Sequence, residues 1–216
     1  MERKDVMNEA VFSGRIVSIR GDGVNGSMTL ACPSITRANR KGKMENEVRT
    51  SYPVLSFNKD TATTDILSKF KRGDHVTVKG YVRSYLRMND SGDAREILNV
   101  YIKEVDFTIS KIFSAFGRDG RTFPDPLNEV YLSGTIVGIT KRSDNIITLR
   151  IDISSPQKKN IITATYYRAP AGLASKFVIG DSIDVLATMQ TVDTKEHTKI
   201  RDYQSLVILD IEKREY

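Results

Sequence analysis

The chain has 216 residues, of which 39% are hydrophobic and 28% are charged, a balance typical of a globular protein and not of a disordered one. Its net charge of +6 favours an acidic partner. No apolar run approaches the roughly 18 residues of a transmembrane helix, and the N-terminal MERKDVMNEAVFSG lacks a signal-peptide pattern, so we expect a cytoplasmic protein without a membrane partner. The single cysteine, Cys32, excludes an internal disulfide and any zinc site with several cysteines, and we expect it in a core.

Two stretches of the chain are closely similar, which indicates an internal repeat. Asn8–Ile19 reads NEAVFSGRIVSI, and Asn128–Ile139 reads NEVYLSGTIVGI. Further matches follow in the same order along both halves: Thr29-Leu30 with Thr148-Leu149, and Lys69-Phe70-x-x-Gly73-Asp74 with Lys176-Phe177-x-x-Gly180-Asp181.

The spacing of this repeat, about 110 to 120 residues, is far too long for a solenoid and predicts two copies of one domain. We expect these domains at residues 1–110 and 127–216. Gly, Asp and Pro in residues 111–126 mark a connector, and its phenylalanines predict that it packs on a domain.

Both copies show the same order of predicted elements, five short strands with a helix between the third and the fourth. In the first copy the strands are 10–19, 28–36, 49–57, 75–85 and 97–107, and the helix is 61–70. In the second copy the strands are 130–140, 146–153, 160–167, 182–191 and 203–211, and the helix is 170–177. This order is typical of the OB-fold, a small barrel that binds oligonucleotides on the face of strands 2 and 3. We therefore predict an all-β protein with minor helix, made of two tandem OB-folds.

The fourth strand of the first copy carries the clearest pattern of a binding surface. Val76, Val78, Gly80 and Val82 share one face, which we expect to be buried. The other face alternates cations and aromatic rings, which suits a flexible polyanion whose bases are free to stack. It carries Thr77, Lys79, Tyr81, Arg83, Tyr85 and Arg87. Residues 89–93 (NDSGD) predict a hairpin turn after this strand. An ordinary solvated hairpin is the alternative.

The predicted loop between strands 2 and 3 of the first copy, residues 36–49, is strongly basic and nearly free of apolar residues. Beside the OB-fold binding face its cations would neutralise phosphates, and a plain solvated loop is the alternative. These cations are Arg37, Arg40, Lys41, Lys43 and Arg49.

Tyr52 or Phe57 on the third strand is a further candidate for base stacking. The two have opposite parity, so one belongs to the core unless a bulge intervenes. We favour Tyr52 as the exposed one because its hydroxyl tolerates water. Pro53 has no backbone N–H and predicts a bulge or an edge position here.

We call the alternating cations and aromatic rings of the first copy's fourth strand the stripe. The second copy lacks such a stripe, because the corresponding positions of its fourth strand carry Asp184, Leu186, Thr188 and Gln190. Other cations and tyrosines of this copy remain candidates for binding: Arg142, Lys158, Lys159, Tyr166, Tyr167 and Arg168. We expect the first domain to supply most of the affinity, while the second extends the site or supplies a subunit contact.

The first copy also resembles a known family. YPVLSF at 52–57, the helix, KFKRGDHVTVKGYVRS at 69–84 and the NDSGDAR hairpin are similar to the strand 3 to strand 5 portion of bacterial and phage single-stranded DNA-binding proteins. The matching motif positions are Arg72-Gly73, Val76, Val78, Gly80 and Ser91-Gly92. The resemblance implies non-enzymatic, largely sequence-independent binding of single-stranded DNA, with RNA as an alternative, in replication, recombination or repair, without a cofactor.

The chain departs from that family in three ways. The family usually stacks bases on tryptophan, and this chain has none, so Tyr or Phe would serve. The family usually carries one domain per chain and forms tetramers, whereas two domains imply a dimer or a monomer. The chain ends IEKREY without an acidic tail, which favours a phage or mobile-element version and leaves the recruitment of replication or recombination proteins open.

An enzyme finds little support in the sequence. His75 and His197 have no Cys or carboxylate companions at ligand spacing, and no GxxxxGK[ST], GxSxG or HExxH motif is present. The rival to nucleic-acid binding is a tandem OB-fold scaffold that docks proteins, or an inhibitor of a replication or defence complex, without nucleic-acid affinity. The stripe of the first copy argues against this rival, and the bare fourth strand of the second argues mildly for it.

Overall fold

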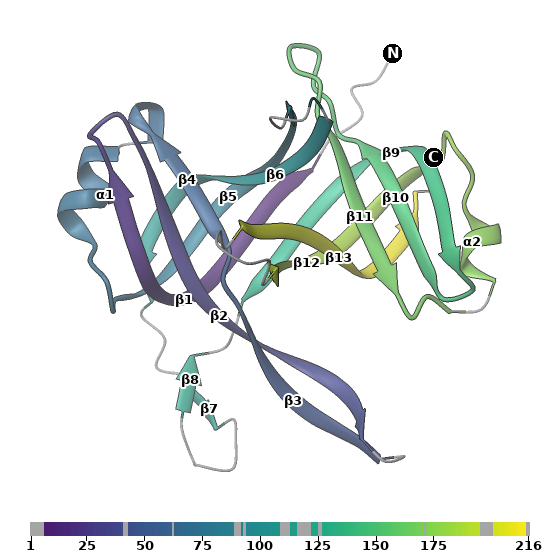
Figure 1. Cartoon of the computed structure of the whole chain (residues 1–216), viewed down its shortest axis with the longest axis horizontal. Coiled ribbons are helices and arrows are strands. Elements are labelled where there is room, and N and C mark those ends of the chain that lie inside the picture. The colour runs from purple at the N-terminus through teal and green to yellow at the C-terminus, as the bar shows by residue number, and fades with distance from the viewer. Residues whose placement is uncertain are drawn as a thin grey trace. The chain divides into compact units, whose positions relative to one another are not determined.

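The computed structural model describes residues 7–40, 43–61, 63–88, 92, 94–108, 113–115, 122–124, 127–170, 172–194 and 201–214. The protein is mostly β-structure with short helices (Figure 1). The first elements are β1 Asn8–Gly21, β2 Asn25–Arg40, β3 Lys43–Ser51, β4 Val54–Asn58, the 3-10 helix η1 Lys59–Thr61, α1 Thr63–Lys69, β5 His75–Met88 and β6 Ala94–Phe107. The later elements are β7 Phe113–Ala115, β8 Thr122–Pro124, β9 Asn128–Ser143, β10 Ile146–Asp152, β11 Ile161–Tyr167, α2 Leu173–Lys176, β12 Ser182–Thr194 and β13 Arg201–Lys213.

The chain forms two compact units whose boundary crosses β5 and β6. The first unit consists of Met1–Ala10, Tyr81–Val100 and Glu129–Tyr216, and the second consists of Val11–Gly80 and Tyr101–Asn128. The distal halves of β5 and β6, which lead to and from their hairpin turn, therefore belong to the same unit as β9 to β13.

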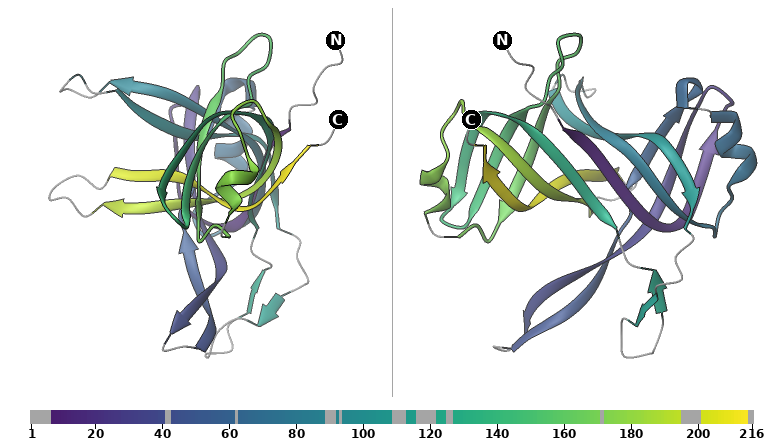
Figure 2. Two further views of the ribbon diagram at one scale, coloured as in Figure 1. Left: turned by 90° about the vertical axis from the view of Figure 1, so that its right-hand side faces the viewer. Right: turned by 180° about the vertical axis from the view of Figure 1, so that it is seen from behind.

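Strands β9 to β13 form a closed five-stranded barrel. The strand order is β10-β11-β13-β12-β9, and β10 also pairs with β9 and closes the circuit. β11 and β13 are parallel, whereas the other pairs are antiparallel. Register shifts in β9–β10 and β12–β13 mark bulges, which help a sheet to curve and close. Ile136, Ile151, Ile162 and Ile183 are fully buried inside this barrel, which Figure 2 shows from two further sides.

The N-terminal strands close in the same order. β1, β5, β6, β4 and β2 are successive neighbours, and β1 also pairs with β2. Phe12, Leu30, Val78 and Ile102 are fully buried and supply the core. Cys32 is also fully buried, which confirms the sequence expectation, and burial raises the pKa of its thiol to about 12.

The Lys-Phe-x-x-Gly-Asp motif at 69–74 builds a tight turn from α1 into β5. Asp74 accepts a hydrogen bond from Lys71 N with its Oδ2 at 2.9 Å. Gly73 has φ of 100°, a left-handed value that favours glycine, and its N–H donates to Ile16 O at 2.9 Å. The motif therefore fixes the turn and fastens it to β1.

The second occurrence of the motif makes the same bonds. Val178 N donates to Asp181 Oδ2 at 2.9 Å, Gly180 has φ of 101°, and its N–H donates to Ile136 O at 2.8 Å. The similarity of the two sequences thus extends to individual hydrogen bonds.

The single strand predicted at residues 49–57 is wrong, because the structure divides these residues between two strands. Residues 49–57 are divided between the end of β3 and β4, and the chain leaves the ladder at Tyr52 and Pro53. The physical reason is that Pro53 has no N–H to donate, although its carbonyl still accepts from Leu30 N at 3.1 Å.

The predicted loop at 36–49 is also wrong, because most of it forms a two-stranded ribbon. β2 continues to Arg40 and pairs with β3 from Cys32↔Ser51 to Arg40↔Lys43. An antiparallel pair satisfies the backbone hydrogen bonds between its strands, so charged residues can form strands without an apolar pattern. Within the expected connector, β7 and β8 pair as a short hairpin; its packing lies outside the described side chains.

The other predicted strands and both predicted helices are present, with shifts of a few residues at their ends. In the described part of the chain, no helix is long and apolar enough to cross a membrane.

Candidate nucleic-acid interface

The two faces of β5 have the parity that the sequence predicts. Val76, Val78 and Val82 are fully buried, whereas the stripe residues of the other parity are half-buried or exposed. Tyr85 is 45% exposed, and Arg87 is exposed. The strand therefore offers a ring and a guanidinium to solvent beyond the buried part of the sheet.

One stripe cation is already paired. Lys79 Nζ lies 3.4 Å from Glu104 Oε2, and both side chains are more than half exposed. Such surface pairs contribute little to stability, but the carboxylate partly offsets the charge that Lys79 presents to an anion.

The distal half of β5 is bonded to the start of β11. Ser84 N donates to Asn160 Oδ1 at 3.1 Å, and Ser84 Oγ donates to Ile161 O. Asn160 Nδ2 donates to Val82 O at 3.0 Å. These bonds place the distal hairpin strand beside β11 within one compact unit (Figure 1). Sequence reasoning missed this contact, because one Ser and one Asn give no local signal for it.

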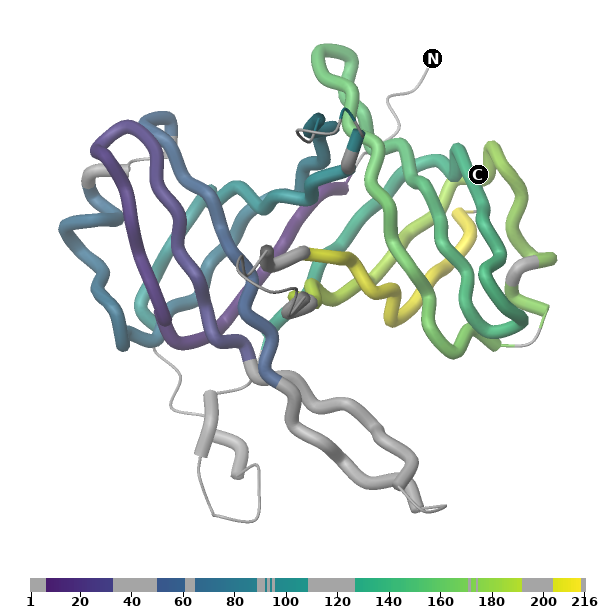
Figure 3. The backbone as a smooth tube through the Cα atoms, in the orientation of Figure 1, coloured from purple at the N-terminus to yellow at the C-terminus, as the bar shows by residue number. Residues whose placement is uncertain are grey.

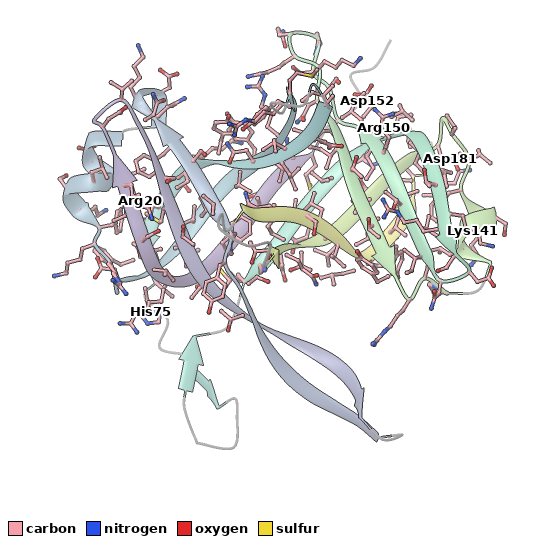
Figure 4. The ribbon with its side chains drawn as sticks, viewed as in Figure 1. Arg20, His75, Lys141, Arg150, Asp152 and Asp181 are labelled. Atoms are coloured by element: carbon pink, nitrogen blue, oxygen red, sulfur yellow. The ribbon has the colours of Figure 1, made fainter. Side chains whose placement is uncertain are left out.

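The outward face of β10 and β11 is a second candidate surface. Ile151, Ile162 and Ala164 are fully buried, so the alternate residues of both strands face outward. The outward residues pair across the two strands as Ile146↔Tyr167, Thr148↔Thr165, Arg150↔Thr163 and Asp152↔Ile161. Tyr167 is 52% exposed, and Arg150 is exposed. Figure 4 labels Arg150 and Asp152 on this barrel, and Figure 3 shows the path of its backbone.

Arg150 is a candidate residue that sequence reasoning missed. It shares parity with Thr148, which would have placed it on the outward face of the second strand. A Cβ on Gly138 of β9 would lie 3.4 to 3.6 Å from the Cβ, Cγ and Cδ of Arg150. The aliphatic stem of Arg150 therefore lies across Gly138, and the glycine leaves room for it.

Tyr166 and Tyr167 separate onto opposite faces. Tyr166 lines an apolar pocket with Ile147 and Phe177, and its hydroxyl donates to Leu209 O at 3.4 Å. Tyr166 is half-buried and shares the inward parity of β11, which argues against the predicted contact of its ring with nucleic acid. Tyr167 remains available.

The remaining candidates of the second copy lie at the surface. Arg142, at the end of β9, is exposed, as are Lys158, Lys159 and Arg168. Arg168 has φ of 57°, an uncommon left-handed value for a residue other than glycine, directly after β11.

Phe57 is not available for stacking, which corrects its inclusion among the candidates. It is 2% exposed and packs so closely on Gly26 that a Cβ there would lie 2.3 Å from its ring. Tyr52 is 46% exposed, as we favoured from its hydroxyl.

The basic candidates of the β2–β3 ribbon are placed by backbone register alone. The pairs Ser34↔Arg49, Arg37↔Asn46 and Arg40↔Lys43 lie along it. Lys41, His197 and most of the predicted turn at 89–93 lie outside the described residues, as do the side chains of the ribbon cations.

Among the described residues, no group of three or more His, Cys, Asp or Glu side chains is arranged to hold a metal ion. His75 is exposed, and its carbonyl accepts a hydrogen bond from Thr108 N at 3.0 Å. His75 therefore lies at the end of a strand pair, at a surface position.

Comparison of the whole chain with solved structures identifies its fold. The wild-type single-stranded DNA binding protein from Thermus aquaticus superposes with a TM-score of 0.65 at 14% sequence identity, covering 98% of this chain and 94% of that chain. A deletion mutant of the same protein gives 0.66 at 14% identity, covering 98% of this chain and 96% of that chain. The chain has the fold of these single-stranded DNA-binding proteins. No family model and no curated protein matches the sequence.

In the OB-fold, the outward residues of the barrel β9–β13, which belongs to the first compact unit, lie on a recognisable face. β10 and β11 are the second and third strands of the closed barrel β9–β13, and the face of these two strands is where OB-folds bind oligonucleotides. Arg150 and Tyr167 lie on that face, and Thr148 and Thr165 between them share a hydroxyl–hydroxyl hydrogen bond of 3.2 Å. The face thus exposes a cation and a ring, whereas Thr148 between them is buried.

Proposed function

We propose that this protein binds single-stranded DNA, with RNA as the alternative, largely independently of base sequence and without catalysing a reaction. The observation that carries the proposal is that exposed tyrosines and arginines lie on outward strand faces of a fold shared with single-stranded DNA-binding proteins. Tyr167 and Arg150 lie on the strand 2 and 3 face, and Tyr85 and Arg87 lie on β5.

In this proposal the tyrosines stack on bases and the cations neutralise phosphates. Every base has a π-face, and stacking on an aromatic ring contributes about 1 to 3 kcal/mol per base. Arg150 and Arg87 contact the sugar–phosphate chain, which carries no sequence information. Binding is therefore tolerant of sequence and weakens as salt rises, because each neutralised phosphate releases counterions.

We further propose two tandem OB-fold domains, at 1–110 and 127–216, separated by the connector at 111–126. The equivalent turns of the two Lys-Phe-x-x-Gly-Asp motifs and the shared strand order support this division. A chain with two such domains would act as a dimer or a monomer. We place its role in replication, recombination or repair, alongside proteins of those processes, and its origin in a phage or mobile element.

The first domain, in this proposal, supplies most of the affinity. Its fourth strand carries the stripe, whereas Asp184 at the corresponding position of the second domain is bonded to Arg214 Nε at 2.7 Å. The second domain extends the path through Tyr167 and its neighbours.

The test is fluorescence anisotropy of a labelled dT oligonucleotide of about 30 nucleotides, titrated with the full chain at low and high salt. We expect tight binding that weakens with salt and that duplex of equal length does not compete away. Competition by an RNA oligonucleotide of equal length measures the preference between the two nucleic acids. No binding at low salt would overturn the proposal and favour an OB-fold that docks proteins.

A further inference from the structure

A carboxylate from the distal hairpin reaches the strand 2 and 3 face of the C-terminal barrel. Glu96 on β6 accepts two hydrogen bonds from Thr163 on β11, from the backbone N–H to Oε1 at 3.2 Å and from Oγ1 to Oε2 at 2.6 Å. Both residues belong to the same compact unit, and Glu96 is exposed at its surface. Both oxygens of one carboxylate are thus bound by one residue.

Thr163, which donates both of these hydrogen bonds, lies among the residues proposed to bind nucleic acid. Thr163 faces outward on β11, and its partner across the ladder is Arg150 on β10. Tyr167 lies four residues further along the same outward face. Glu96 therefore brings a negative charge to a face on which phosphates would have to lie.

The chemistry at Thr163 suits a phosphate as well as a carboxylate. Protein contacts to nucleic-acid phosphates come from backbone N–H groups, Thr hydroxyls and arginines, and Thr163 and Arg150 offer one of each. Hydrogen bonds to an ionised acceptor are shorter and stronger than neutral ones, and the 2.6 Å contact from Oγ1 is of that kind.

We propose that Thr163 and Arg150 form a phosphate-binding subsite that Glu96 occupies when no nucleic acid is bound. This inference rests on the proposed function. A bound strand replaces the carboxylate of Glu96 with one of its own phosphates, and the free energy of the two Glu96 bonds is subtracted from the free energy of binding. Glu96 is then an internal competitor that lowers affinity, and it holds the hairpin against β11 in the free protein.

The first arm of the experiment measures affinity for the labelled dT oligonucleotide. Glu96→Gln removes the charge and keeps the shape of the side chain, and Glu212→Gln, at an exposed position of β13, makes the same change in net charge away from this face. We expect Glu96→Gln to bind about three- to tenfold more tightly than the wild type, the effect of losing a hydrogen bond of ordinary net strength. Glu212→Gln should change affinity by less than about twofold.

The second arm tests whether the phosphate takes the place of the carboxylate. Thr163→Val removes the hydroxyl, and it should weaken dT binding more in the Glu96→Gln protein than in the wild type, where that hydroxyl is already occupied. Thr163→Ser should restore the loss. In the wild-type protein, the NMR amide resonance of Thr163 should shift when dT is added.

The outcomes separate this inference from the proposed function. Equal affinities of Glu96→Gln and Glu212→Gln, an equal effect of Thr163→Val in both backgrounds, or an unmoved Thr163 amide in the dT complex would overturn the subsite while dT binding stands. Weaker dT binding by Glu96→Gln would also overturn it and make the contact a structural latch. No dT binding by any of the proteins would overturn both.

Discussion

The side chain of Asn8 bonds the backbone of Val82 in both directions, as a neighbouring strand would. Asn8 Nδ2 donates to Val82 O at 2.8 Å, and Val82 N donates to Asn8 Oδ1 at 2.9 Å. Val82 is fully buried, and its carbonyl also accepts from Asn160. The side-chain amides of Asn8 and Asn160 thus hold β5 at the point where it enters the unit that contains β11.

Replacing Asn8 with alanine should destabilise the protein. The N–H of Val82 would lose its acceptor in a buried position, which costs about 1 to 3 kcal/mol, whereas the carbonyl keeps its bond to Asn160. Urea unfolding followed by circular dichroism measures the change in the free energy of unfolding. Glu9→Ala, at an exposed neighbouring position, should stay within about 0.5 kcal/mol of the wild type. Equal stabilities of the two variants would show that the amide bonds contribute nothing.

The two similar segments each contain a Ser-Gly pair, Ser13-Gly14 and Ser133-Gly134. Neither glycine should tolerate a side chain, because each lies against a backbone oxygen. A Cβ on Gly14 would lie 2.5 Å from Ala31 O, and a Cβ on Gly134 would lie 2.5 Å from Asp152 O. Because backbone oxygens cannot move aside, we expect either alanine variant to lose more than about 2 kcal/mol of stability. For Gly138→Ala the nearest atoms belong to the flexible side chain of Arg150, at 3.4 Å, and this variant is the control in the same unfolding experiment. Wild-type stability of Gly14→Ala would contradict the geometry.

An ion pair at the C-terminal barrel should make stability depend on pH. The hydrogen bond from Arg214, with a second from Ser133 Oγ at 2.5 Å, lowers the pKa of Asp184 below its ordinary value. A carboxyl whose pKa is lower in the folded state stabilises the protein above the unfolded pKa of about 4, and this stabilisation is lost as pH falls through the folded pKa.

The variant Asp184→Asn should therefore be less stable than the wild type at neutral pH, by about 1 kcal/mol or less because the pair is partly exposed. The difference should shrink as the pH falls below about 4 and through the lowered pKa of Asp184. Thermal unfolding at neutral pH and at pH values below about 4 measures it, with Asp106→Asn, at an exposed position of β6, as the control. A difference that grows as the pH falls would show that the sign of the linkage is wrong.

The thiol of Cys32 should be inert in the native protein. It is fully buried with a pKa of about 12, so the reactive thiolate is almost absent at neutral pH. A thiol reagent such as DTNB should label one group per chain in urea and almost none without it. Rapid labelling without urea would mean that the core around β2 opens readily.

Tyrosines on opposite faces of the same strand should differ in their effect on DNA binding. Tyr167→Ala and Tyr85→Ala should each weaken dT binding by about 1 to 3 kcal/mol for each base that loses its stacking partner. Tyr166→Phe keeps the packed ring and should bind like the wild type. Anisotropy titration at one salt concentration measures these three variants and Tyr81→Ala. A larger loss for Tyr167→Ala than for Tyr85→Ala and Tyr81→Ala together would reverse the proposed division between the domains.

Local pattern in the sequence was sufficient to predict most of the strands. The alternation Val76, Val78, Val82 marks a buried face because a strand turns successive side chains to opposite sides. The Gly-Asp turns were readable as well, since glycine and aspartate supply the left-handed φ and the bond to the backbone that such a turn requires. The pattern did not predict the β2–β3 ribbon, because its strands have no alternating apolar face. These strands are held by backbone pairing instead.

Tertiary structure alone decided which side chains meet across the chain. Nothing near Glu96 distinguishes it from other exposed glutamates, and its bond to Thr163 exists only because the distal hairpin lies beside β11. The contact of Arg150 with Gly138 and the pocket that Tyr166 lines were likewise decided by packing between strands and not by local pattern. Local periodicity records which face of a strand is buried, but partners far apart in sequence are determined by the packing of the whole unit, because hydrogen bonds to a single polar side chain leave no repeating pattern in the sequence.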